Sequence, residues 1–129
     1  MRIATCRPLP EIDVDENLLL EALRRHGVHA RMAAWNDPAQ DWDAPVATLI
    51  RSTWDYIHDL AAFRAWLARA ERAAPLWNPR QVIEPNLHKG YLLLLEQRGV
   101  AIAPTELVLR GSTKSLSEIR CRILINTML

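Results

Sequence analysis

The residues with the clearest chemical potential follow the apolar run from Val46 to Ile50, where residues 51–56 read RSTWDY. A guanidinium, two hydroxyls, a carboxylate and two aromatic rings are therefore expected where a β-strand ends. Ligands bind at the carboxyl ends of the strands in open α/β sheets, and an arginine can hold a carboxylate through two parallel hydrogen bonds. We interpret Arg51 as part of a ligand site. The spacing leaves one alternative open, a structural loop in which Arg51 pairs with Asp55 and the aromatic rings pack.

Asn78-Pro79 and Lys89 form a second group of interest. If Asn86 caps a helix, Lys89 stands at the third helical position. A cation there interacts unfavourably with the helix dipole, at a cost of about 0.3–1 kcal/mol. A residue that breaks a local rule is a candidate for function, and a bound anion would reverse this cost. Position alone favours the alternative, a lysine that extends into solvent.

Other patterns give no catalytic or metal site. The four histidines lack a short metal-ligand spacing, and Cys6 and Cys121 are too few and too far apart for a disulfide framework or a metal site. The segment 111–115 lacks the first glycine and the Gly-Lys pair of a phosphate-binding loop. The remaining acidic cluster is better explained by a helix cap and a solvated loop than by a cation site, and it consists of Asp13, Asp15, Asp41 and Asp43.

The first elements expected along the chain are a strand at 2–5 and a helix capped by Asp13, with Glu16 as the reciprocal partner. Gly27 ends this helix in a left-handed conformation. Its expected buried face consists of Leu18, Leu19, Ala22 and Leu23. Strands are expected at 28–35 and 46–50, joined by a polar connection.

Asp59 caps a second expected helix, and a strand follows at 76–77. The core face of this helix consists of Leu60, Phe63, Trp66, Leu67 and Ala70. Pro85-Asn86 opens a third helix at 87–98, which Gly99 closes, and 104–109 suits a strand. Because strands alternate with helices, the expected fold class is α/β, with a small parallel, Rossmann-like sheet. The loop after Thr5 should then share a crevice with a partly exposed Arg51.

Composition and charge limit the class of protein. Half of the 129 residues are hydrophobic and 24% are charged, which is typical of a soluble globular protein. The chain has no apolar run of about 20 residues and no signal-peptide pattern, so we expect a cytoplasmic protein without a membrane partner. Residues 1–60 hold six Lys/Arg against ten Asp/Glu, and residues 61–129 hold ten against five. The basic residues are scattered, which argues against nucleic-acid binding and favours a small anion as partner.

Four segments together resemble the ATP-grasp ligases. They read ATC at 4–6, IRSTWDY at 50–56, NPRQVIEPNLHKGYLLLL at 78–95 and VAIAPTELVL at 100–109. The nearest subgroup is the stand-alone ATP-grasp proteins related to the cycloserine-pathway cyclo-ligase, and glutathione synthetase is more distant. The resemblance implies a pre-ATP-grasp substrate domain over 1–84 and the start of an ATP-grasp domain over 85–129.

The same resemblance implies roles for particular residues. Arg51, Thr53 and Asp55 are expected near a small carboxylate or amino-acid-like substrate, and Lys89 resembles the family's first nucleotide-facing lysine. Family members use ATP and Mg²⁺ to form an acyl phosphate, which an amine then displaces. No catalytic residue and no metal ligand is assigned in this chain.

The sequence departs from the family after Leu109, and the segment 111–129 is atypical. We therefore expect a truncated or frame-shifted fragment that binds ATP and Mg²⁺ poorly, is inactive alone and self-associates. Residues 111–129 should be the least ordered, with a short helix placing Leu116, Ile119 and Ile123 on one face. Two alternatives stay open. One is a small flavodoxin-like binding module for an anionic metabolite, and the other is a structural domain that dimerises.

Overall fold

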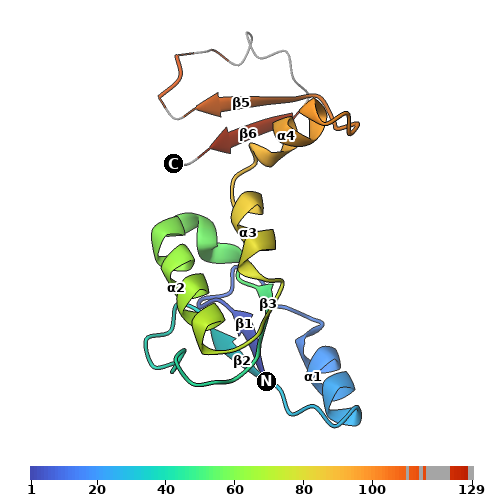
Figure 1. Cartoon of the computed structure of the whole chain (residues 1–129), viewed down its shortest axis with the longest axis vertical. Coiled ribbons are helices and arrows are strands. Elements are labelled where there is room, and N and C mark those ends of the chain that lie inside the picture. The colour runs from blue at the N-terminus through green and yellow to red at the C-terminus, as the bar shows by residue number, and fades with distance from the viewer. Residues whose placement is uncertain (110, 114, 116–122, 128–129) are drawn as a thin grey trace. The chain divides into compact units, whose positions relative to one another are not determined.

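The computed structural model describes residues 1–109, 111–113, 115 and 123–127, and it divides the chain into two compact units, Met1–Ile83 and Glu84–Leu129 (Figure 1). The first unit contains β1 (Arg2–Thr5), α1 (Glu16–Arg25), β2 (Arg31–Ala34), β3 (Thr48–Ser52), the 3₁₀ helix η1 (Trp54–His58), α2 (Leu60–Ala73) and β4 (Leu76–Trp77). Helix α3 (Arg80–Asn86) crosses the boundary, and α4 (Tyr91–Gln97), β5 (Thr105–Leu109) and β6 (Ile123–Thr127) follow.

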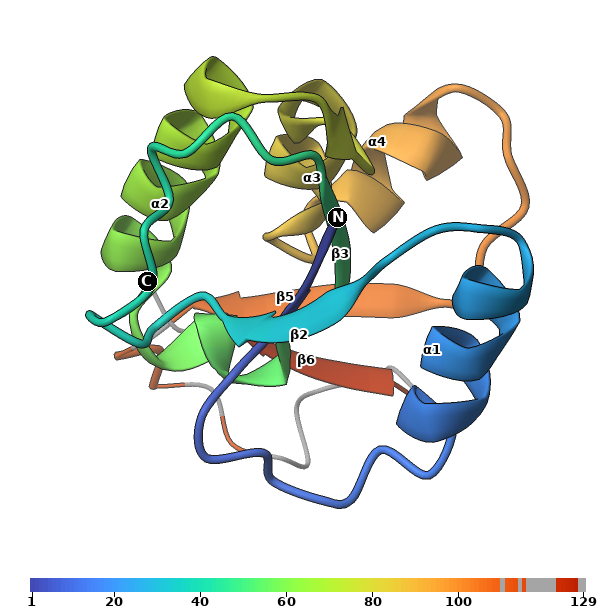
Figure 2. The same cartoon turned by 90° about the horizontal axis from the view of Figure 1, so that it is seen from below.

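The four strands of the first unit form one parallel sheet in the order β2-β1-β3-β4. Helices α1 and α2 lie on opposite faces of this sheet, as Figures 1 and 2 both show. The expected α/β class with a small parallel, Rossmann-like sheet is therefore confirmed. The sheet also places β1 beside β3, as required for the loop after Thr5 to approach Arg51.

The hydrophobic core lies between the sheet and α2. Phe63, Trp66, Leu67 and Ala70 are buried, as the helical spacing predicts. The ring of Trp35, from the end of β2, meets Phe63 edge to face at 5.1 Å, an arrangement that aromatic pairs prefer. Asp59 accepts a hydrogen bond from the backbone N–H of Ala62 at 2.9 Å, which confirms its predicted role as the cap of α2.

The buried face predicted for α1 is wrong in part. Leu18 is 63% exposed, Ala22 is exposed, and Leu19 and Leu23 are only half-buried. Asp15, rather than Asp13, is the residue before the first turn, and its side chain makes no capping hydrogen bond. An apolar stripe shows which face of a helix prefers burial, but it does not show how closely a neighbour covers that face. Gly27 ends the helix with a φ of +75°, as expected.

The third strand begins two residues later than the sequence predicts. Arg2 sets this boundary, because its buried guanidinium donates to the carbonyl oxygens of Asp41 at 2.6 Å, Ala44 at 2.9 Å and Val46 at 2.8 Å. Val46 is thereby held in the loop, and the strand pairing begins at Thr48, opposite Arg2. The shift places Arg51 inside β3 rather than after it. Strand β2 also begins late, at Arg31.

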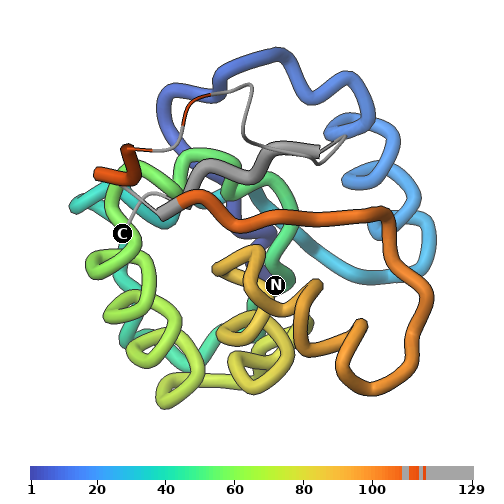
Figure 3. The backbone as a smooth tube through the Cα atoms, turned by 90° about the horizontal axis from the view of Figure 1, so that it is seen from above, coloured from blue at the N-terminus to red at the C-terminus, as the bar shows by residue number. Residues whose placement is uncertain are grey.

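The helix predicted at 87–98 is confirmed only in part, because α4 is confined to Tyr91–Gln97 and a separate short helix, α3, precedes it at Arg80–Asn86. Pro85 lies inside α3 instead of opening a helix, and Asn86 is the last residue of α3. His88 accepts a hydrogen bond from the backbone N–H of Gly90 at 3.0 Å within the turn that precedes α4. A proline has no N–H to donate and ends helices, so the chain turns soon after it. Figure 3 traces this turn and the path from α4 into β5.

The second unit contains the strand predicted at 104–109, which is β5, and a parallel partner, β6, that the sequence does not predict. β5 and β6 pair over five residues, from Thr105 opposite Ile123 to Leu109 opposite Thr127. Ile123 thus belongs to a strand instead of the expected short helix. Leu116 and Ile119 lie outside the described residues. Within the described part of the chain, no helix combines the length and the apolar character of a membrane span.

Arg2→Met should lower the free energy of unfolding by about 3 kcal/mol, because three carbonyl oxygens lose a charged donor. All five tryptophans lie in the first unit, so urea unfolding followed by tryptophan fluorescence measures this loss. Arg31→Met is the matched control, since Arg31 lies opposite Arg2 in the sheet and donates to Gln40 at an exposed position. Equal midpoints for the two variants would show that the Arg2 contacts do not stabilise the loop.

Candidate functional site

The candidate site lies where β1 and β3 end side by side. After β1 the chain leads to β2 on one side of the pair, and after β3 it leads to β4 on the other side. Such a switch in strand order is where ligands bind in open parallel sheets, because the two loops diverge and leave a crevice. Thr5 lies opposite Ser52 after an irregularity in the pairing, and the Thr5 hydroxyl donates to the Ser52 carbonyl at 3.4 Å.

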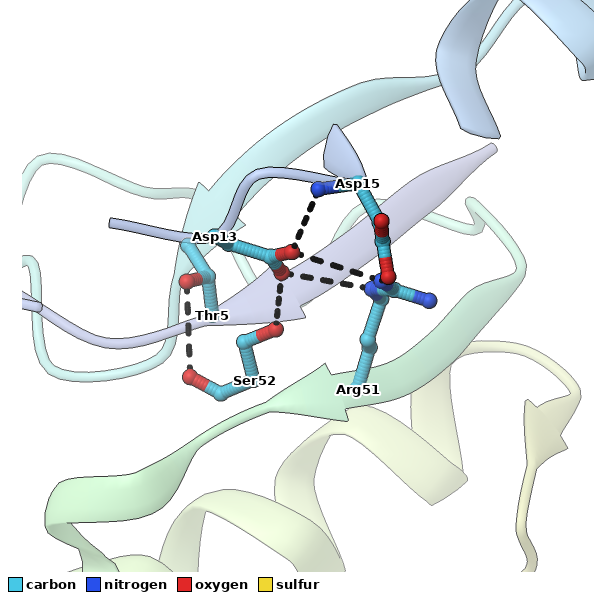
Figure 4. Close-up of polar contacts among 5 residues, drawn as sticks. All are labelled: Thr5, Asp13, Asp15, Arg51 and Ser52. Carbon is cyan, nitrogen blue, oxygen red and sulfur yellow. Dashed lines mark hydrogen bonds and ion pairs between the residues drawn. The ribbon is translucent and has the colours of Figure 1, made fainter. Parts of the chain in front are cut away.

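Arg51 is the one cation among the residues drawn in Figure 4, and 32% of its side chain is accessible. Its Nε and Nη2 atoms each donate to one oxygen of Asp13 at 3.3 Å. The second neighbour, Asp15, is 3.7 Å from Nη2 and remains mostly exposed. Arg51 therefore contacts the segment after β1, as predicted. The alternative in which it pairs with Asp55 is wrong.

Asp13 is the centre of this polar cluster, and its side chain is only 7% exposed. Besides the two contacts from Arg51, it accepts the Ser52 hydroxyl at 2.6 Å and the backbone N–H of Asp15 at 3.2 Å. The hydrogen bonds from Arg51 and then from Ser52 hold the pKa of Asp13 below its ordinary value. The same pairing raises the pKa of Arg51. Asp13 is thus a charged partner that orients Arg51, a role that its predicted helix cap did not suggest.

Asp55 joins the loops that follow three strands. One of its carboxylate oxygens accepts from Trp35 Nε1 at 2.6 Å and the other from Asn36 Nδ2 at 2.7 Å. The Asn36 side chain also exchanges two hydrogen bonds with the backbone of Arg7, at 2.6 and 2.9 Å. Sequence reasoning missed both Trp35 and Asn36. These contacts give Asp55 a positioning role, and the predicted contact with substrate stays a prediction.

Thr53 and Cys6 fill the interior of the same edge. Thr53 is 6% exposed and stands between β3 and η1, so its predicted contact with substrate also stays a prediction. Cys6 is fully buried and is a free thiol. Burial raises the pKa of this thiol, which keeps it protonated at neutral pH and excludes it as an activated nucleophile.

Asn78 and Lys89 differ in how the structure uses them. Asn78 ends β4 with a φ of +60°, a left-handed conformation that asparagine tolerates, and its amide donates to the Ile50 carbonyl at 3.3 Å. Lys89 lies in the second unit, in the turn before α4, with its ammonium 5.7 Å from the centre of the Tyr91 ring. It is not in the first turn of a helix, so the predicted conflict with a helix dipole does not arise. Its role toward a nucleotide stays a prediction.

Comparison with known proteins identifies the family. Residues 1–78, which contain β1 to β4 and the Arg51 cluster, match the family model "D-cycloserine synthetase DcsG, N-terminal domain". The chain belongs to this family. Over 101 residues, the chain is 36% identical to the cycloserine biosynthesis protein DcsG of Streptomyces lavendulae. The matched region is 78% of this chain and 34% of that protein.

The crystal structure of D-cycloserine synthetase DcsG superimposes with a TM-score of 0.72 at 32% identity and covers 80% of this chain. The shared region is 35% of the synthetase chain. The chain thus spans about a third of the length of the relatives that it matches.

Asp13→Asn should lower stability at pH 7, and the difference from the native chain should disappear on acidification. Because the pKa of Asp13 is lower in the folded chain, its carboxylate stabilises the fold above about pH 4 and loses this effect as the pH falls through the folded-state pKa. Urea midpoints at pH 7, 5 and 3 measure the trend, with the exposed Asp15→Asn as control. A pH-independent difference would refute the assigned role of the charge.

Proposed function

We propose that this chain provides the substrate-binding domain of an ATP-dependent, ATP-grasp-type carboxylate–amine ligase that functions in cycloserine synthesis. The name of the relative, D-cycloserine synthetase, supports the synthetic role. The observation that carries the proposal is the position of Arg51, a partly exposed guanidinium at the switch point of the family's N-terminal domain.

Arg51 is arranged to bind a carboxylate through its outer edge. Asp13 holds the Nε and Nη2 edge of the guanidinium, while Nη1 donates to no described residue. A substrate carboxylate can take the Nη1 and Nη2 edge through two parallel hydrogen bonds. It would displace only Asp15, whose side chain is 67% exposed and 3.7 Å away. In this proposal Thr53 lines the substrate region, and Asp55 fixes the loops around it.

The described residues do not by themselves fit ATP and Mg²⁺. Among them, no three His, Cys, Asp or Glu side chains come together as metal ligands. The residue predicted to face a nucleotide, Lys89, supplies a single positive charge. We therefore assign no phosphoryl-transfer step to these residues. In the proposal, activation of the substrate as an acyl phosphate is a property of a complete synthetase, and this chain contributes substrate binding.

The chain alone should release no phosphate from ATP in the presence of Mg²⁺, and Lys89→Ala should not change this result. A phosphate-release assay on the purified chain tests the expectation, with the heat-denatured chain as the background. Mg²⁺-dependent release that Lys89→Ala abolishes would contradict the proposed division of function.

Arg51→Lys should weaken carboxylate binding about tenfold, because lysine cannot reproduce two parallel hydrogen bonds. NMR titration of the chain with propionate measures this change, and propionamide is the neutral control. Urea unfolding of the same variant separates the two roles of Arg51. Equal propionate affinity with a lower urea midpoint would make Arg51 a structural partner of Asp13 only.

The alternative is a small flavodoxin-like module that binds an anionic metabolite without a synthetase. It is favoured by the fact that Arg51 and its partners Asp13 and Ser52 all lie in the first unit. Saturable, micromolar binding of an anionic metabolite by the chain alone, lost in Arg51→Lys, would support this module over the ligase domain.

A further inference from the structure

A cavity of about 610 Å³ lies between α2 and the connection that follows β2. Its lining comes from residues 35–42, from η1 and from α2, so it is contained in the first unit. Neither Arg51 nor Thr53 is among the residues that line it. The volume falls within the range of about 300–1,000 Å³ that is usual for small-molecule sites. The cavity therefore has the size for a ligand of its own.

Three tryptophans form the apolar part of the lining. Trp66 lies between Trp35, with ring centres 6.0 Å apart, and Trp42, with ring centres 5.1 Å apart. Ala62 and Ala65 of α2 leave room in front of them. Indole rings attract organic cations more strongly than other aromatic side chains do.

Two of these indoles carry an N–H group without an acceptor. Trp42 and Trp66 are 2% and 6% exposed, and Nε1 of each meets no hydrogen-bond partner among the described residues. The N–H of a buried tryptophan usually finds an acceptor. By contrast, Trp35 donates its N–H to Asp55. Both Nε1 atoms are themselves inaccessible, so these two indoles can offer the cavity only their ring carbons.

The charged part of the lining has more carboxylates than cations. It includes the carboxylates of Asp37, Asp55 and Asp59, and the neutral amides of Asn36 and Gln40 and the imidazole of His58 complete the polar lining with Arg69. The guanidinium of Arg69 also lines the cavity, but Asp43 binds it through two hydrogen bonds at 2.7 and 2.8 Å.

No cation among the described residues compensates the charge of Asp55. Its partners Trp35 and Asn36 are neutral. In the same part of the chain, the partner of opposite charge for Asp37 is the exposed Arg7, at 3.8 Å. A cation inside the cavity would therefore meet the uncompensated carboxylate of Asp55.

We propose that this cavity is a binding site for a small organic cation, a primary or substituted ammonium with an apolar body. The carboxylates of Asp55 and Asp59 attract the ammonium group, and the indoles of Trp35, Trp42 and Trp66 receive the apolar body. The site is separate from Arg51 and does not depend on the proposed ligase function. It requires only the first unit.

Three probes of similar size and different charge test the site: benzylammonium, benzyl alcohol and benzoate. Titration of the full chain, followed through the tryptophan indole N–H signals in NMR spectra, gives each affinity and reports which tryptophans respond. Benzylammonium should bind about tenfold more tightly than the other two and should shift the signals of Trp35, Trp42 and Trp66. Equal affinity for the three probes, or no saturable binding of benzylammonium, would overturn the proposal.

Two variants locate the binding. Ala62→Leu fills the cavity and should abolish benzylammonium binding, whereas Ala61→Leu, on the same helix outside the lining, should leave it unchanged. Asp59→Ser keeps a side-chain cap for α2 but removes the charge, and should weaken benzylammonium about threefold without changing benzyl alcohol. Unchanged binding in Ala62→Leu, with a native urea midpoint, would show that the ligand binds elsewhere.

Discussion

β1 is bordered by parallel neighbours on both edges, β2 on one side and β3 on the other, and this arrangement decides which loops of the first unit can meet. It aligns Thr5 with Ser52 and Arg2 with Thr48. At one end of β1, Arg2 holds the connection before β3 through three carbonyl oxygens. At the other end, the segment after β1 brings Asp13 to Arg51. The strand pairing thus positions both the loop that walls the cavity and the polar cluster at the switch point.

The two proposed sites differ in how charge is arranged around them. Arg51 is oriented along one edge by Asp13, and its outer edge remains for an anion. In the cavity, the only lining guanidinium is already bound by Asp43, so the carboxylates determine the sign of the field. Asp55 contributes to both regions, because its hydrogen bonds to Trp35 and Asn36 fix the loops and its side chain also lines the cavity. A domain with both features can select between ligands by charge as well as by size.

The positions of most elements followed from local patterns. These patterns depend on neighbours within a few residues in sequence. They include the cap at Asp59, the apolar spacing of Phe63, Trp66 and Leu67, and the glycines at 27 and 99. Such signals act within one turn of a helix, so they can be read before the chain is folded. The error at the start of β3 occurred because a distant group decides the boundary. Val46 suits a strand by its side chain, but its carbonyl is bound by Arg2, 44 residues away.

The sequence by itself determined that the chain forms a parallel α/β sheet and that Arg51 stands near the carboxyl end of a strand. Tertiary structure alone decided the partners of the charged groups. Asp13 binds Arg51 from 38 residues away, and Asp55 binds Trp35 from 20 residues away. Any of ten acidic residues in the first 60 positions has the charge to pair with Arg51. Only the packing of the sheet determines which one comes within hydrogen-bonding distance, because charge attracts without direction whereas the backbone fixes position.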